Sequence, residues 1–209
     1  MPKTPRLLLL AMLTLLTATA ASRAQTDPLA TAIAAAQDPH ADLIVVFDRT
    51  TSEVEESGLS HVVSHRLTKV LTADGARELR SQRFDYDPTS QLIEVRQARV
   101  HRHDGSIEDL DLASVVDTTQ PMHAIYWGAR MLVLPVPRLE VGDALEVETY
   151  RKGFMIAYLG GAEDPDEDRY IPPMRGHWYD VQVFAERYPM VEKTVTVRLP
   201  LDKRLQYRT

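Results

Sequence analysis

The sequence has 209 residues, of which 24 are basic and 30 are acidic, so its formal net charge is −6 at pH 7. This balance offers no broad positive surface, and nucleic acid is not an expected partner. Cysteine is absent, which excludes disulfides, thiolate metal sites and a cysteine nucleophile from this sequence.

The N-terminal residues have the pattern of a secretory signal peptide. Two basic residues precede an apolar run over 7–16, and small residues stand at the −3 and −1 positions before Gln25. We predict a signal peptide over residues 1–24 with cleavage after Ala24; cleavage after Ala20 is the second choice. The apolar run is too short to cross a hydrocarbon core of ~30 Å as a helix. The protein is therefore expected in the periplasm or outside the cell, without a membrane span after cleavage; an uncleaved anchor is the alternative.

Residues 25–38 are predicted to form a short helix and linker. Asp27 is an N-cap candidate, Pro28 suits the first helical position, and an alanine-rich run follows as far as Gln37. A helix of this length is marginal alone, so it must pack against the rest of the chain.

A long hairpin is predicted next. Residues 43–56 and 59–71 read as strands joined by a Ser57-Gly58 turn, with Val63 and Leu67 on the buried face. Arms of about 13 residues would each reach ~40 Å, so the hairpin should span the whole domain.

The middle of the chain alternates strands with turn residues. We expect a turn at 72–75, a half-turn of helix or a strand start at 76–80, and an irregular crossing at 84–88. Residues 92–100 read as a strand that could turn either face inward. A hairpin turn at 103–106 and a short strand or extended loop at 110–117 follow, before a break at 118–121.

The last part of the chain continues the same pattern. Two strands lie within 129–150, the first ended by Leu134-Pro135 and the second preceded by a Gly142-Asp143 turn. Further strands are predicted over 177–186, 194–199 and 204–209. About nine or ten strands with one short N-terminal helix indicate an all-β antiparallel β-sandwich. A closed barrel is the alternative.

No set of residues makes a convincing catalytic or metal site. His61 and His65 would lie about 13 Å apart on one strand, too far to share a metal ion. His101 and His103 would lie about 7 Å apart and could bind zinc only together with a carboxylate such as Asp104. No serine stands in a nucleophile-elbow motif, and the paired carboxylates fall in turns and loops. We therefore expect no metal, no cofactor and no enzymatic activity.

Two aromatic pairs are the candidate binding surface: Tyr126 with Trp127, and Trp178 with Tyr179. Adjacent residues in a strand point to opposite faces, so one member of each pair could be exposed and contact a sugar or a protein. Packing at the rim of the sandwich is the alternative interpretation.

Several short motifs occur in the order typical of one protein family. They are Pro39-His40-Ala41-Asp42, Arg66-Leu67-Thr68-Lys69-Val70-Leu71-Thr72 with Gly75, Ala98-Arg99-Val100 with Asp104-Gly105, Leu134-Pro135 with Val141-Gly142-Asp143 and Glu146, and Tyr188-Pro189. Through them residues 38–207 resemble the domain of unknown function 3857 (DUF3857), which precedes transglutaminase-like domains in exported bacterial proteins. The resemblance implies an immunoglobulin-like sandwich over residues 39–209.

The resemblance assigns no catalytic residue to this chain. In relatives the catalytic cysteine, histidine and aspartate belong to the following transglutaminase-like domain, which this sequence does not contain. Two functions are therefore expected. One is a non-catalytic exported module associated with, or fused to, a transglutaminase- or protease-like domain. The other is a stand-alone envelope module that binds a glycan or peptide. The sequence leaves open whether the chain is complete or the front of a longer protein.

Overall fold

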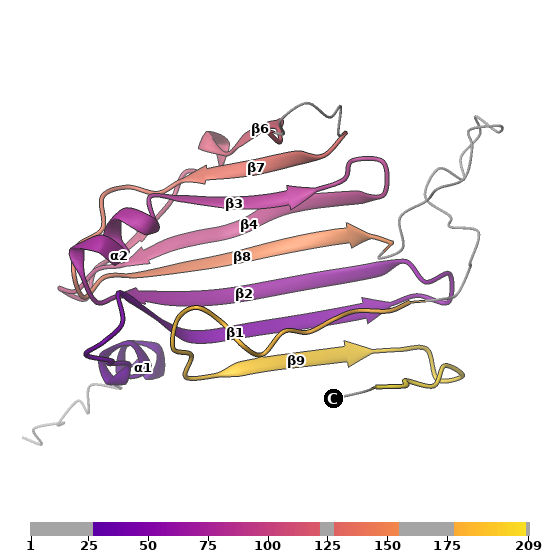
Figure 1. Cartoon of the computed structure of the whole chain (residues 1–209), viewed down its shortest axis with the longest axis horizontal. Coiled ribbons are helices and arrows are strands. Elements are labelled where there is room, and N and C mark those ends of the chain that lie inside the picture. Colours follow the sequence, from indigo (N-terminus) through magenta and orange to yellow (C-terminus); the bar gives the residue numbers. More distant parts are fainter. Residues whose placement is uncertain (1–26, 122–127, 155–177, 208–209) are drawn as a thin grey trace, which may run out of the picture.

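The computed structural model describes residues 27–121, 128–154 and 178–207. Within these ranges the chain forms nine β-strands, two short α-helices and one 3-10 turn (Figure 1). In chain order they are α1 (Pro28–Ala35), β1 (Leu43–Val54), β2 (Ser60–Val70), α2 (Ala73–Glu78), β3 (Ser81–Tyr86), β4 (Gln91–His101), β5 (Ile107–Asp109), η1 (Leu112–Ser114), β6 (Val116–Thr119), β7 (Arg130–Pro135), β8 (Ala144–Gly153) and β9 (Lys193–Arg198). None of the described helices is long and apolar enough to cross a membrane.

Six strands form the larger sheet, in the spatial order β5-β4-β8-β2-β1-β9. Its neighbouring strands run antiparallel, as predicted, except that β9 pairs parallel with β1 (Figure 1). The prediction of a wholly antiparallel fold is therefore wrong at this edge. A parallel pair needs a long crossover connection, and the chain between β8 and β9 provides one over residues 154–192.

β1 and β2 form the predicted hairpin. They pair over 43–54 and 60–70, and Gly58 in the turn has φ of +88°, which glycine adopts without steric cost. Leu67 is fully buried, whereas Val63 is only partly buried. The predicted buried face is thus confirmed toward the C-terminal end of β2 and is weaker toward the turn.

The smaller sheet has the order β3-β7-β6. The smaller sheet shares an apolar core with the larger sheet, near α2. This core consists of Leu43, Val70, Leu79, Ala98, Val100, Leu134, Val136, Leu139, Leu145 and Val147. β7 and β8 follow each other in the chain but lie in different sheets, so the connection at 136–143 passes from one layer to the other. Two sheets around one core are the layout of a β-sandwich.

The predicted N-terminal helix is present as α1, and it packs on the face of the larger sheet away from the smaller one. Asp27 caps it by accepting a hydrogen bond from the backbone N–H of Leu29. Lys69 of β2 is buried, and its Nζ donates to the carbonyls of Ile33 (2.8 Å) and Ala36 (3.0 Å). An ammonium group at the C-terminal end of the helix satisfies carbonyls that have no partner within the helix.

Several predicted elements differ from those observed. Residues 81–86 form β3 rather than an irregular crossing, because they pair with β7 along their whole length. The predicted break at 118–121 begins later, since Thr118 and Thr119 belong to β6. Residues 178–186 and 204–207 carry alternating side chains but form no strand. Alternation alone does not create a strand where no neighbouring backbone offers a ladder of hydrogen bonds.

Candidate functional site

A buried carboxylate lies near the middle of the larger sheet. Glu146 of β8 pairs in register with Leu67 of β2 on one side and with Arg99 of β4 on the other. Side chains alternate along strands, so His65 and His101, each two positions away on these neighbours, share the face of Glu146. Nε2 of His65 lies 2.7 Å from Oε1, and Nε2 of His101 lies 2.7 Å from Oε2. Each carboxylate oxygen therefore contacts an imidazole from a different strand.

The environment of Glu146 keeps it ionised. Only 5% of the residue is exposed. Burial raises the pKa of the Glu146 carboxyl, but the hydrogen bonds from His101 and His65 outweigh this effect and bring the pKa below its usual range. Phe47 covers His65 edge-on, with 4.8 Å between ring centroids. The Glu146 carboxylate is therefore held by two imidazoles, one of which packs against the Phe47 ring.

This cluster pairs one carboxylate with two imidazoles, a combination that also occurs in acyl-transfer sites. A carboxylate that orients an imidazole is the supporting pair of a serine or threonine nucleophile. In the described ranges neither His65 nor His101 hydrogen-bonds to a hydroxyl, and Glu146 is the polar partner of both. The same ranges contain no group of three or more histidine, aspartate or glutamate side chains arranged to hold a metal ion. Through these two hydrogen bonds, Glu146 links its own strand β8 to β2 and to β4.

The two other histidines of the predicted pairs have separate partners. Nδ1 of His61 lies 2.6 Å from the hydroxyl of Tyr150, and its Nε2 lies 2.8 Å from a carboxylate oxygen of Glu55. His103 contacts Asp143 rather than the partner of His101. His61 and His103 thus contact different carboxylates. The site considered for His101, His103 and Asp104 is not formed, because His101 contacts Glu146 and His103 contacts Asp143.

A second buried carboxylate organises one end of the molecule. Asp143 is fully buried just before β8. Its Oδ1 accepts from N and Nδ1 of His103 at 2.9 and 3.0 Å, and its Oδ2 accepts from Nη1 of Arg102 at 2.8 Å and from N of Glu140 at 3.0 Å. Burial raises the pKa of Asp143, and these hydrogen bonds lower it below its usual range. The loop over 138–143 is therefore fixed to the hairpin of β4 and β5.

Exposed apolar side chains concentrate in the C-terminal part of the chain. Eight of the twelve large apolar residues that are exposed in the described ranges fall within 179–207. We call them the C-terminal apolar surface: Tyr179, Val181, Val183, Phe184, Val191, Leu201, Leu205 and Tyr207. In Figure 1 this yellow part of the chain runs along β1 and continues through β9 at the edge of the larger sheet.

The backbone that carries this surface is anchored to β1 and β2. N of Val45 donates to the carbonyl of Pro189, and N of Val191 donates back to the carbonyl of Val45, both at 2.9 Å. Nη2 of Arg66 lies 2.7 Å from a carboxylate oxygen of Glu186. The backbone of this segment is therefore held against the larger sheet, while its apolar side chains remain exposed.

Comparison with known families identifies the chain. The sequence model described as "Domain of Unknown Function with solved-structure structure (DUF3857)" matches residues 56–209. The chain belongs to the DUF3857 family. The resemblance drawn from the strand and turn motifs is thereby confirmed, and β2 to β9 lie inside the matched range. No match was found among curated proteins.

Among solved structures, this DUF3857 chain is similar to a Parabacteroides distasonis ATCC 8503 protein described as a "putative protease", with a TM-score of 0.50 and 13% identity. The match covers 56% of this chain and 24% of that one, so the chain spans about a quarter of that protein's length. Two matches are to family 3a carbohydrate-binding modules from the CipA scaffolding of Clostridium thermocellum. The first has a TM-score of 0.31 and 12% identity and covers 53% of this chain and 75% of the module. The second, which includes flanking linkers, has a TM-score of 0.33 and 11% identity and covers 66% of this chain and 91% of that one.

The structure describes some, but not all, of the site residues predicted from the sequence. Ala24 and Gln25, at the predicted cleavage site, and the pair Tyr126 and Trp127 lie outside the described residues. Trp178 is partly buried, and its Nε1 is buried without a hydrogen-bond partner in the described ranges. Tyr179 is 59% exposed and belongs to the C-terminal apolar surface.

Sequence reasoning missed Glu146 as a site residue, although it contributed to the family resemblance. Its alternation with Leu145 and Val147 predicts a polar side chain facing water, whereas the structure buries both faces of β8 at this point. The available signal was a pair of histidines, His65 and His101, in two other predicted strands. Only the strand order brings them next to Glu146.

Proposed function

We propose that this DUF3857 domain is a non-catalytic exported module that binds a transglutaminase- or protease-like domain through the C-terminal apolar surface. The exposure of large apolar side chains on an anchored segment is the observation that carries this proposal. Exposed apolar side chains gathered in one segment are a feature of interaction sites in soluble proteins, because their exposure to water is unfavourable. The predicted signal peptide supports export, and the two-sheet layout supports the immunoglobulin-like sandwich that the family resemblance implies.

The nature of the partner is inferred from the comparisons and from the buried cluster. The chain resembles about a quarter of a larger protein described as a protease, so the rest of such an assembly would supply the chemistry. In the described ranges the hydrogen-bond partner of His65 and of His101 is Glu146, a contact that supports a structural role for this cluster. Both points favour a module that positions a catalytic domain or its substrate.

Site-specific photo-crosslinking in the source organism tests this partner. A photoreactive residue at Val183 or Leu201 should crosslink to a protein or domain with a transglutaminase- or protease-like fold, identified by mass spectrometry. Leu92 is the matched control, because it is 50% exposed but lies on β4, outside the proposed surface. Equal capture of the same protein from Leu92, or capture of proteins without such a fold, would contradict the proposal.

The absence of catalysis has its own test. The purified chain is incubated with peptide and ester substrates and with a serine-reactive fluorophosphonate probe. We expect neither turnover nor labelling. Labelling that disappears when one serine is changed to alanine would show that the chain carries its own nucleophile.

The stand-alone binding module remains a second candidate because two exposed aromatic residues, Tyr179 and Phe184, occur in the same segment. Exposed aromatic faces can stack on sugar rings or anchor a peptide. Binding of an envelope glycan or peptide that is lost in Tyr179→Ala, without any crosslinked catalytic partner, would favour this reading.

A further inference from the structure

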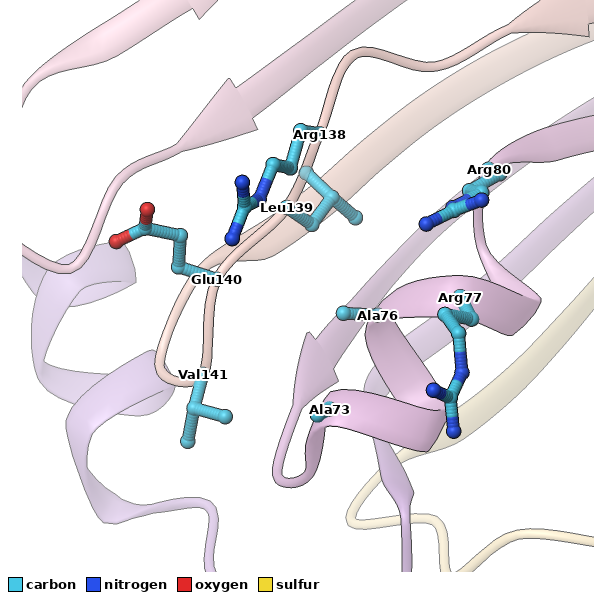
Figure 2. Close-up of a pocket in the computed structure, with 8 residues that line it drawn as sticks. All are labelled: Ala73, Ala76, Arg77, Arg80, Arg138, Leu139, Glu140 and Val141. Carbon is cyan, nitrogen blue, oxygen red and sulfur yellow. The ribbon is translucent and has the colours of Figure 1, made fainter.

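An open cavity of about 460 Å³ lies beside α2 (Figure 2). One wall comes from α2 and the turn after it, and the other comes from the connection between β7 and β8. In Figure 2 the Arg80 side chain points from the turn after α2 toward the opposite wall, Arg138 extends along that wall on the side of Glu140, and Arg77 runs down along α2. The remaining lining residues are Ala73, Ala76, Leu139, Glu140 and Val141.

Two of the three arginines are available to a ligand. Arg77 forms an ion pair with Asp74, one turn earlier in α2. The guanidinium groups of Arg80 and Arg138 have no hydrogen bond or ion pair within the part of the chain that the structure describes. Other arginines, such as Arg102, are neutralised by carboxylates. Two unpaired guanidinium groups that line one cavity give it a positive charge suited to an oxyanion.

The two walls are held relative to each other by hydrogen bonds. N of Val136 donates to the carbonyl of Arg80 at 2.9 Å, which ties the connection after β7 to the turn before β3. Nη1 of Arg102 donates to the carbonyl of Arg138 at 2.9 Å, and the same nitrogen binds the buried Asp143. The backbone at both arginines is therefore preorganised, so a ligand would need to order only the two side chains.

The charge of the cavity selects the kind of anion. Glu140 also lines it and offsets one of the two free positive charges, which leaves a net charge close to +1. That value matches a carboxylate better than a doubly charged phosphate. The cavity also has an apolar floor, which consists of the lining residues Ala73, Ala76 and Leu139. A ligand with a carboxylate next to a small aliphatic group would complement both features.

We propose that this cavity binds the carboxyl terminus of a short peptide with small aliphatic side chains. The carboxylate lies between the guanidinium groups of Arg80 and Arg138, and the adjacent side chain rests on the apolar floor. The cavity shares no residue with the C-terminal apolar surface, so this proposal stands or falls separately from the proposed function.

The test is a titration of the purified, 15N-labelled protein with N-acetyl-alanyl-alanine, followed by NMR. We expect chemical-shift changes at residues that line the cavity and a dissociation constant of about 1 mM, a value that ordinary ligand efficiency gives for a ligand of this size. The C-terminal amide of the same dipeptide is the matched ligand control and should bind at least about tenfold more weakly. Equal binding of the amide would overturn the proposal.

Variants separate a site from general surface binding. Arg80→Gln and Arg138→Gln should each weaken binding about tenfold, while Arg198→Gln, an exposed arginine on β9, should leave it unchanged. Glu140→Gln removes the opposing carboxylate and should strengthen binding about twofold to fivefold, a gain that misfolding cannot produce. No shift changes at the cavity, unaltered binding in both arginine variants, or tighter binding of inorganic phosphate than of the dipeptide would each overturn the assignment.

Discussion

Glu146 is a charged residue in a position that requires partners for both of its oxygens. Changing Glu146→Gln keeps the shape but leaves one oxygen position unable to accept a hydrogen bond from a histidine. We expect a loss of about 1–3 kcal/mol in the free energy of unfolding, the usual cost of a buried unsatisfied polar group. Urea unfolding at pH 7 measures it. Glu148→Gln, two residues along the same strand and partly exposed, is the control and should change stability by less than about 0.5 kcal/mol.

The same residue predicts how stability depends on pH. The pKa of Glu146 is lower in the folded protein than the value of about 4.3 expected for an unfolded chain. Its contribution to stability is therefore fully present above the unfolded pKa and is lost as the pH falls through the folded pKa. The difference in unfolding free energy between the wild type and Glu146→Gln should therefore narrow over the range of pH below the unfolded pKa of about 4.3. A constant difference across this range would contradict the assignment.

Asp143 is the second residue whose charge the fold depends on. Removing it by Asp143→Ala leaves Arg102 without its buried partner and frees the backbone N–H groups of His103 and Glu140. Arg102 keeps its second partner, Glu108, so we expect a loss of about 1–3 kcal/mol, the cost of leaving buried N–H groups without an acceptor. Thermal or urea unfolding measures the loss. Asp202→Ala, in an exposed turn, is the control, and equal stability of the two variants would show that Asp143 is not an anchor.

Neither buried carboxylate could be recognised as buried from the sequence. Gly142-Asp143 is correctly predicted as a turn, but a turn residue is normally exposed, and the burial of Asp143 follows from its contact with the β4–β5 hairpin. Glu146 is predicted on a water-facing side because its neighbours alternate. The strand order decides the environment of Glu146, and the contact with the β4–β5 hairpin decides that of Asp143; both depend on residues far apart in the chain.

At the scale of elements, α2 depends on a close approach to the chain before β1. Gly75 lies in this helix, and a Cβ atom there would lie 2.2 Å from the carbonyl oxygen of Asp42. Helix propensity alone predicts that Gly75→Ala stabilises by up to about 1 kcal/mol. We expect the opposite, a destabilisation of about 1–3 kcal/mol, because the backbone must move to relieve the clash. Urea unfolding decides the sign, and Gly128→Ala, with open space around its Cβ, is the matched control.

The elements that could be predicted are those whose ends are set by local chemistry. The β1–β2 hairpin and the turn before β5 are correct because Gly58 and Gly105, with φ near +88°, make tight turns and the flanking residues alternate. β3 was missed because Pro88 and the acidic residues near it suggested a break. The segment 178–186 was mistaken for a strand because alternation does not show whether a neighbouring strand is present.

At the scale of the whole molecule, the chain combines a two-sheet β scaffold with the C-terminal apolar surface, whose exposure to water is unfavourable. The larger and the smaller sheet share one apolar core. The C-terminal apolar surface adds nothing to that core, since its side chains remain exposed. Residues that neither stabilise the core nor favour solvation are expected where another molecule binds.

This surface leads to a last prediction. Val183→Glu combined with Leu201→Glu should leave the free energy of unfolding within about 0.5 kcal/mol of the wild type, because both side chains are exposed. The same change should lower the fluorescence of a bound hydrophobic dye and reduce self-association at high protein concentration, measured by light scattering. Leu92→Glu alters an exposed apolar residue elsewhere and should do neither. If the double variant instead loses several kcal/mol of stability, these side chains pack within the fold and are not a surface for a partner.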